Sequence, residues 1–145
     1  MKIRKYAAID IGSNAVRLLI SNVIESKQQT QFFKNSLVRV PIRLGQDSFT
    51  SGKISDRNIK RLVDSIKSFK ILMNVHGVEN YLAYATSALR DAKNGNIIVS
   101  KILFKTGINI EIIDGRREAK IISKTDVFQE IDIEKTYLYV DVGGG

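Results

Sequence analysis

The stretch YAAIDIGSNAVRLLI, from Tyr6 to Ile20, interrupts an apolar run with an aspartate, a glycine, a serine and an asparagine. The apolar residues from Tyr6 to Ile11 are typical of a short buried strand, and a second strand is predicted from Val16 to Ile24. The residues between the two strands, Gly12 to Asn14, predict a tight turn. Two interpretations of this turn are open: it is a plain hairpin, or it also holds an anion and a metal ion.

The composition is that of an ordinary globular chain. Hydrophobic residues make up 43% and charged residues 26% of the 145 residues, so the chain can bury a core and is not expected to be disordered. This length fits one domain or a part of a larger protein. No apolar run approaches the roughly 18 residues of a membrane span and no signal-peptide core follows the N-terminus, so we expect a cytoplasmic protein.

The residue types that are absent or rare limit the kinds of reaction and metal site that this chain can support. Cysteine is absent and His76 is the one histidine, which excludes disulfides, thiolate catalysis, cysteine zinc sites and histidine clusters within this chain. His76 precedes Gly77 at a predicted helix end, where capping is the more common role. Carboxylates, basic groups, hydroxyls and backbone amides are therefore the groups that could carry a reaction.

A formal net charge of +8 indicates a polyanionic partner. Much of this excess is predicted to lie on the solvated face of one helix. Nucleic acid is a weaker candidate, because aromatic residues make up 8% of the chain and no basic stripe is interleaved with them. The basic residues of that helix and the loop before it are Lys53, Arg57, Lys60, Arg61, Lys67 and Lys70.

The middle of the chain changes from strand to helix periodicity. An extended segment is predicted from Gln31 to Leu44, and Pro41 within it indicates an edge strand or a bulge, because proline has no ladder donor. Ser55 and Asp56 are candidate N-caps. Apolar residues then recur at helical spacing until the stop signal at residues 74–77.

The remaining residues alternate between strand and helix. We predict a strand at 81–86, a helix at about 96–106, a strand at 108–113, a helix at about 116–130 and a strand at 136–142. Three strands in a meander followed by alternating helices and strands indicate an α/β fold with a mixed five-stranded sheet and flanking helices. The strand at 136–142 is assigned to a second unit, because its sequence repeats that of the first strand.

This internal similarity joins the two ends of the chain. KYAAIDIGSN, from Lys5 to Asn14, and TYLYVDVGGG, from Thr136 to Gly145, both read as a tyrosine-led apolar strand, an aspartate, an aliphatic residue and small residues. Three terminal glycines would begin a hairpin that has no return strand. We therefore expect a first domain at residues 1–132 and, at residues 133–145, the first strand and loop of a truncated, related domain.

The repeated turn has the residue types of a phosphate and magnesium site. Asp10 and Asp141 each end a predicted strand, where a carboxylate can bind magnesium directly or through water. Consecutive small residues expose backbone amides that can cradle a phosphate, with Ser13 and Asn14 as further donors. One such turn favours a hairpin, but two similar turns about 130 residues apart favour the anion site. The glycines that can adopt positive φ there are Gly12, Gly143, Gly144 and Gly145.

These residues resemble a known family. The loops Asp10–Asn14 and Asp141–Gly145 resemble those of the actin, sugar-kinase and Hsp70 superfamily, in which two ribonuclease H-like domains clamp a phosphorylated ligand. Within it, ATSALRDAKNG (Ala85 to Gly95) and IEIIDGRREAKII (Ile110 to Ile122) resemble the exopolyphosphatase and guanosine pentaphosphate phosphohydrolase family. The resemblance covers nearly the whole chain and implies a ribonuclease H-like fold.

The resemblance also implies an activity. Members of that family hydrolyse the terminal phosphoanhydride bond of inorganic polyphosphate, or the 5'-terminal phosphate of guanosine pentaphosphate, with magnesium. The position of their general base corresponds to Glu118. The preceding residue, commonly acidic in the family, is Arg117, which departs from the pattern. Viewed without the resemblance, a glutamate in the first turn of a helix more often complements the helix dipole.

Two arginines complete the candidate site. Arg90 follows the predicted strand at 81–86 in a loop, and it matches an arginine of the family; a planar guanidinium suits phosphate oxygens. Its alternative role is a surface salt bridge with Asp91. Arg17, at the start of the second strand, is expected to support phosphate binding.

Several alternatives stay open from the sequence. An ATP-dependent phosphotransferase of the same superfamily, or a non-catalytic nucleotide or polyphosphate sensor, would share both loops, and Arg117 slightly favours the sensor. The sequence does not choose between polyphosphate and guanosine pentaphosphate, and it leaves open a homodimer of the complete protein. Because the cleft needs two walls, we expect this chain alone to be nearly inactive.

Overall fold

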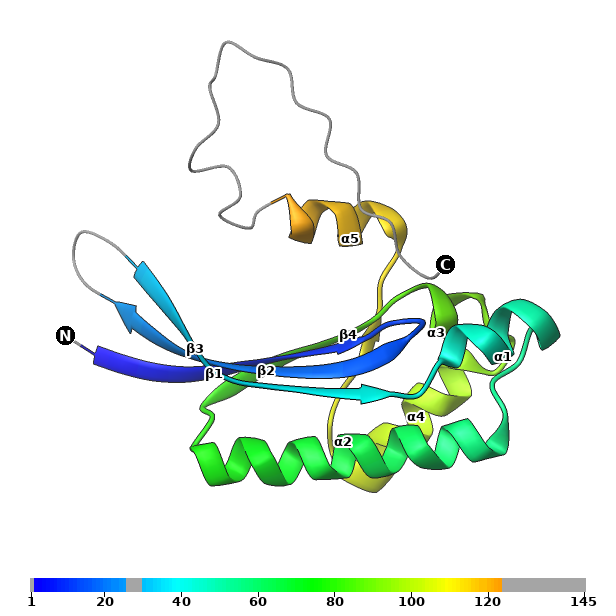
Figure 1. The fold of residues 1–145 in the computed structure, drawn as a ribbon, viewed down its shortest axis with the longest axis horizontal. Coiled ribbons are helices and arrows are strands. Elements are labelled where there is room, and N and C mark those ends of the chain that lie inside the picture. The colour runs from blue at the N-terminus through cyan, green and yellow to red at the C-terminus, as the bar shows by residue number, and fades with distance from the viewer. Residues whose placement is uncertain (1, 26–29, 124–145) are drawn as a thin grey trace, which may run out of the picture.

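The structure is a computed structural model and describes residues 2–25 and 30–123. A mixed sheet organises this part of the chain (Figure 1). Five strands lie in the order β3-β2-β1-β4-β5. β1, β2 and β3 are antiparallel neighbours, whereas β4 runs parallel to β1, and β5 parallel to β4. The strands are β1 (Lys2–Ile11), β2 (Ala15–Glu25), β3 (Thr30–Pro41), β4 (Asn80–Ala85) and β5 (Glu111–Ile112).

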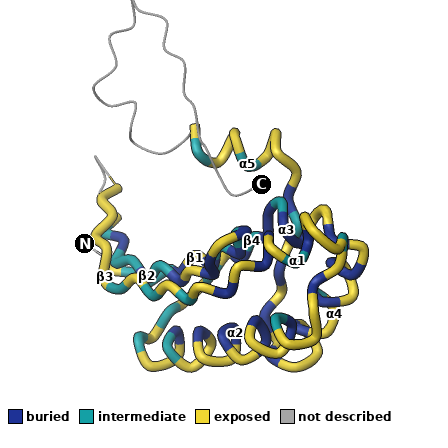
Figure 2. Tube along the Cα trace, turned by 45° about the vertical axis from the view of Figure 1, so that its right-hand side comes forward, coloured by how far each residue is buried: buried dark blue, intermediate teal, exposed yellow. Residues whose placement is uncertain are grey.

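Alternation along the strands decides which face of the sheet is buried. Ile9 pairs with Leu18 and Ile11 with Val16 in the first hairpin, and all four side chains are buried. They lie on one face because residues two apart on a strand share a face. Two of the helices, α2 (Asp56–His76) and α4 (Gly95–Thr106), cover that face. Figure 2 shows buried and exposed residues alternating along α2, as expected for a helix with one packed side.

Helix α2 begins and ends as the sequence predicts. The Ser55 hydroxyl accepts a hydrogen bond from the Asn58 amide at 3.4 Å, which confirms the N-cap. Gly77 adopts a φ of 69° at the C-cap, a conformation that glycine reaches without a steric cost. His76 is the last helical residue, and its carbonyl accepts a hydrogen bond from Lys5 at 2.8 Å.

The extended segment predicted to reach Leu44 is shorter than expected. β3 ends at Pro41 on the edge of the sheet, which confirms the edge position that the proline indicates. Leu44 instead begins α1 (Leu44–Ser51), a helix that the sequence analysis missed. The chain turns at Arg43, whose φ is 61°, and Leu44 inserts into the core with no exposed surface. Burial of Leu44 against the sheet thus overrides the strand periodicity.

The second half of the chain differs from the prediction in two places. The strand expected at 108–113 contains β5 at Glu111–Ile112. Arg90 lies not in a loop but in α3 (Ser87–Asp91), a helix too short to show a period in the sequence. The helix expected at 116–130 appears as α5 (Gly115–Ile122); residues 124–130, the strand at 136–142 and the proposed domain boundary at 132/133 lie outside the described residues.

No helix in the described part of the chain is long and apolar enough to cross a membrane.

Gly95 fixes the close approach of α3 and α4. A Cβ atom at this position would lie 1.9 Å from the Leu89 carbonyl oxygen, next to Arg90 in the chain. Because a backbone atom cannot move aside as a side chain can, we expect Gly95→Ala to lower the free energy of unfolding by about 3 kcal/mol, at the upper end for overpacking. Urea unfolding followed by circular dichroism measures this loss.

Gly115→Ala is the matched control, because no atom lies within 4 Å of a Cβ placed there. Its free energy of unfolding should stay within about 0.5 kcal/mol of the wild-type value. Equal stability of Gly95→Ala and the wild type would show that the α3–α4 junction is not tight.

Candidate functional site

Parallel pairing brings three connections to one edge of the sheet. The Thr86 amide donates to the Ile11 carbonyl at 3.2 Å, and the Ile113 amide donates to the Ala85 carbonyl at 2.9 Å. The carboxyl ends of β1, β4 and β5 are therefore level with one another. Ligands of open α/β sheets bind outside such carboxyl ends. The residues that leave these strands form the turn after β1, helix α3 after β4 and helix α5 after β5.

The turn after β1 keeps two backbone donors unused within the described part of the chain. The Gly12 amide closes the turn by donating to the Ala15 carbonyl at 3.1 Å, so the predicted hairpin is present. The carbonyls of Ser13 and Asn14 accept from the amides of Gly45 and Arg43, at 2.8 and 2.9 Å. No described residue accepts a hydrogen bond from the amides of Ser13 or Asn14. Two adjacent amides without a partner form the kind of backbone concavity that binds anions.

Gly12 does not adopt the positive φ that the sequence analysis allowed for it. The glycines with positive φ in the described residues are Gly52, Gly77 and Gly107. A Cβ atom at Gly12 would lie 3.4 Å from the Ala15 carbonyl oxygen, an ordinary contact. The fold itself therefore does not demand glycine here, and the small residue leaves room for a ligand to approach the backbone.

A pair of hydroxyl groups connects the first turn to α3. The Oγ atoms of Ser13 and Ser87 lie 2.8 Å apart in a hydrogen bond, and Ser13 is buried. Ser87 is not among the site residues that the sequence predicts. The signal that could have identified Ser87 is its position: its hydroxyl group directly follows the strand predicted at 81–86, and this strand is parallel to the first strand.

Asp10 and Arg17 face each other across the first hairpin. The two residues are register partners, and Arg17 donates to the Asp10 carboxylate at 3.0 Å. Each side chain is nearly half exposed. An exposed pair of this kind is worth about 0–1 kcal/mol, so a phosphate or a divalent cation can compete for either partner.

Arg90 links the second connection to the third. From α3 its guanidinium donates to the Ile113 carbonyl at 3.3 Å and lies 3.9 Å from the Glu118 carboxylate. The salt bridge with Asp91 that the sequence left as an alternative is also present, at 3.3 Å. Arg90 thus places a guanidinium cation, a group that can bind phosphate oxygens, beside the predicted general base.

Glu118 lies in the first turn of α5. The Asp114 carboxylate caps this helix by accepting from the Arg117 amide at 2.7 Å, and the Glu118 amide donates to the Asp114 carbonyl at 3.0 Å. None of the α5 residues is buried (Figure 2). The position of α5 therefore depends on polar contacts rather than on an apolar core.

Arg117, the residue that departs from the family pattern, points at the sheet. Its guanidinium donates two hydrogen bonds to the Glu111 carboxylate and one, at 3.4 Å, to the Tyr84 hydroxyl. It also lies over the Tyr84 ring, 5.3 Å from the centroid. The hydrogen bond with Tyr84 and the charge of Glu111 raise the pKa of Arg117 further above its usual value. Tyr84 and Glu111 had no assigned role from the sequence.

The second half of the predicted site lies outside the described residues, namely Asp141, Gly143, Gly144 and Gly145. Within the described ranges, no three acidic or histidine residues gather to hold a metal ion. Magnesium usually binds one or two carboxylates together with waters and substrate phosphates. A single half-exposed carboxylate such as Asp10 is compatible with that donor set.

Comparisons with known proteins agree with this geometry. The model of the Ppx/GppA phosphatase family matches residues 23–145. A bifunctional 3-dehydroquinate synthase/phosphatase of Fusobacterium nucleatum is 32% identical over 143 residues, covering 96% of this chain and 22% of the relative. Exopolyphosphatase 1 of Mycobacterium tuberculosis is 29% identical over 117 residues, covering 81% of this chain and 33% of the relative.

The fold is also similar to a solved structure. The Aquifex aeolicus member of the Ppx/GppA family matches with a TM-score of 0.75 and 27% identity, over 81% of this chain and 37% of that chain. This similarity confirms the expected ribonuclease H-like fold. The chain spans about a fifth to a third of the curated relatives named above. The match of the family model over most of its length shows that the chain belongs to the Ppx/GppA phosphatase family.

Proposed function

We propose that the complete protein is a phosphohydrolase that releases the terminal phosphate of inorganic polyphosphate or guanosine pentaphosphate, and that this chain supplies one wall of its site. The observation that carries the proposal is that the candidate groups gather at one edge of the sheet. At that edge the unused amides of Ser13 and Asn14 lie on a turn that is hydrogen-bonded to α3, and Arg90 of α3 lies beside Glu118.

Each group has a role that follows from its chemistry. The amides of Ser13 and Asn14 donate to phosphate oxygens, and Gly12 lets the ligand approach the backbone. Arg90 neutralises negative charge on the transferred group, and Glu118 accepts a proton from water. Arg17 supports phosphate binding through its exposed guanidinium. The second wall would come from the loop at Asp141 to Gly145.

The reaction is a displacement at the terminal phosphorus. The water oxygen forms a new bond to that phosphorus while its proton passes to the Glu118 carboxylate. The bond from phosphorus to the bridging oxygen breaks, and its electron pair stays on the shortened chain. Positioning and charge neutralisation supply most of the rate in such reactions, so the reaction needs no cysteine or histidine nucleophile.

Magnesium fits this arrangement as a cofactor. Asp10 would hold it together with Asp141, and the bound ion would supply charge neutralisation to the phosphate oxygens. Asp10 also forms an ion pair with Arg17 at 3.0 Å, so the carboxylate lies beside a cation.

The geometry of Arg117 supports hydrolysis over a non-catalytic sensor. From the sequence, Arg117 slightly favoured the sensor, but its guanidinium is bound by Glu111 and Tyr84 on the sheet. We therefore assign Arg117 a positioning role. It ties the otherwise exposed first turn of α5 to β4 and β5, and this sets the place of Glu118 relative to Arg90.

Glu118→Gln tests the general base. The amide keeps the size of the carboxylate but cannot accept the proton, so kcat of the complete protein should fall by about 10²–10⁴-fold. Binding of polyphosphate should stay near the wild-type value. Phosphate release is measured on both polyphosphate and guanosine pentaphosphate, and release at the wild-type rate on either would reject the assignment.

Gly12→Ala separates a phosphate cradle from a plain hairpin. Because an added Cβ makes an ordinary contact within the chain, the free energy of unfolding should change by less than about 0.5 kcal/mol. The same methyl group would obstruct a phosphate at the turn, so the affinity for tripolyphosphate should fall about tenfold or more, which is about 1.4 kcal/mol. The shifts of the ¹⁵N-labelled backbone amides at residues 12–14 during the titration measure the affinity of the turn. If neither the affinity for tripolyphosphate nor the free energy of unfolding changes, the turn is a plain hairpin and not a phosphate cradle.

A charge reversal tests the positioning role of Arg117. Arg117→Glu replaces attraction to Glu111 with repulsion, so kcat should fall about tenfold with little change in KM, because the substrate contacts remain. The additional substitution Glu111→Arg restores opposite charges and should recover most of the lost kcat. If the double variant is no faster than Arg117→Glu alone, the contact with Glu111 does not position Glu118.

A further inference from the structure

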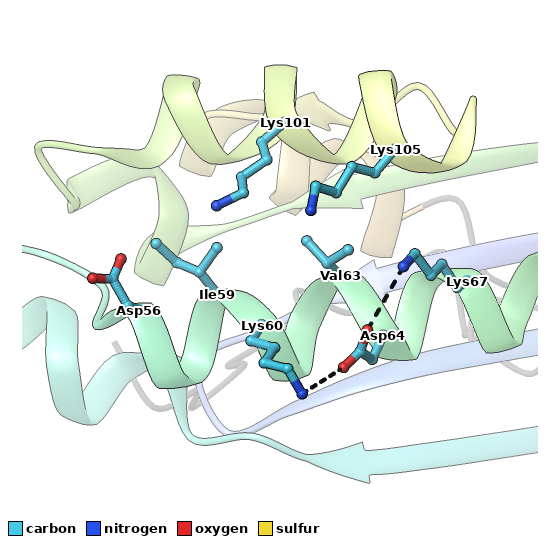
Figure 3. A pocket seen from close by; sticks show the side chains of 8 residues that line it. All are labelled: Asp56, Ile59, Lys60, Val63, Asp64, Lys67, Lys101 and Lys105. Atoms are coloured by element: carbon cyan, nitrogen blue, oxygen red, sulfur yellow. Dashed lines mark ion pairs between the residues drawn. The ribbon is translucent and has the colours of Figure 1, made fainter.

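A basic groove lies between two helices on the packed side of the sheet. It encloses about 370 Å³ between α2 and α4, and Figure 3 shows the side chains around it. None of its residues belongs to the candidate site. The groove is lined by four lysines, two aspartates and two aliphatic residues: Lys60, Lys67, Lys101, Lys105, Asp56, Asp64, Ile59 and Val63.

The lysines on the two walls differ in their partners. On α2, Asp64 forms ion pairs with Lys60 at 3.5 Å and with Lys67 at 3.9 Å. On α4, Lys101 and Lys105 have no hydrogen bond or ion pair with any described residue. Their side chains reach from α4 toward α2 in Figure 3. The α4 wall therefore carries the uncompensated charge of the groove.

Two like charges held four residues apart on a helix disfavour each other. Lys101 and Lys105 lie about 6 Å apart along the α4 axis, and such i,i+4 pairs of equal charge destabilise a helix. An anion placed between them would remove this repulsion. On the facing wall, Lys60 and Lys67 lie about 10 Å apart along α2, and Asp64 between them forms an ion pair with each.

We propose that this groove is a second anion site that binds a linear chain of phosphate groups. Two rows of lysines along a groove match an extended ligand with repeated charges better than a single small anion. The ammonium group of lysine is a compact point charge that binds phosphate without a fixed geometry. The proposal does not depend on the hydrolysis proposed above, because the two sets of residues are separate.

The lining residues favour a phosphate chain over a nucleic acid. Sequence-tolerant nucleic-acid sites stack bases on aromatic side chains. No aromatic residue lines the groove. Ile59 and Val63, below Lys101 and Lys105 in Figure 3, offer a base neither a stacking ring nor a hydrogen bond.

A titration with site-specific readout tests the proposal. The ¹⁵N-labelled chain is titrated with tripolyphosphate, and the shifts of backbone amides at residues 59–67 and 101–105 are fitted to an affinity for the groove. Binding at the turn of residues 12–14 is read separately from its own amides. The double variant Lys101→Gln and Lys105→Gln should weaken groove binding about tenfold. The variant Asp64→Asn should strengthen it about threefold, because it removes the carboxylate that competes for Lys60 and Lys67.

Matched controls separate the groove from the net charge. The double variant Lys34→Gln and Lys93→Gln removes the same charge from residues that do not line the groove, and it should bind as the wild type does. The proposal is overturned if this control weakens binding as much as the groove variant does, or if Asp64→Asn binds no more tightly. It is also overturned if a single-stranded oligonucleotide with the same number of phosphates binds more tightly than tripolyphosphate, as fitted from the groove amides.

Discussion

The parallel pairing of β4 with β1 is the constraint on which the candidate site depends. This pairing sets Ile11 beside Ala85 and so ends both strands at the same level. The hydrogen bond between Ser13 and Ser87 forms across the two strand ends. A shift of one residue in this register would turn the side chains of β4 to the other face of the sheet and would separate the two hydroxyl groups.

The two halves of the site are held by different forces. The first turn is anchored by a buried core, since Ile9, Ile11, Val16 and Leu18 pack beneath it. Glu118, in contrast, lies on a helix with no buried residue. This helix is held by the contacts of Arg90 with Glu118 and of Arg117 with Glu111. Exposed ion pairs contribute little to stability. The fold can therefore tolerate changes in these arginines that the proposed reaction cannot.

The sequence predicted the elements whose signals are local. Helix α2 has a serine cap, a helical apolar period and a glycine stop, and all three appear in the structure. Helices α1 and α3 were missed because one or two turns carry no period, and the burial of Leu44 and Leu89 that fixes them is a tertiary property. The contacts of Arg117 could not be predicted either, since Glu111 and Tyr84 reach it through strand pairing. Motif resemblance supplied Glu118 and Arg90, and the structure shows them 3.9 Å apart.

The central claim is that water attacks the terminal phosphorus at this edge of the sheet. Its most direct test is the fate of the oxygen atom when the complete protein is incubated with polyphosphate in H₂¹⁸O. The account predicts one ¹⁸O atom in each released phosphate and none in the shortened chain, as mass spectrometry can measure. Release of phosphate without ¹⁸O, or ¹⁸O in the shortened chain, would contradict it.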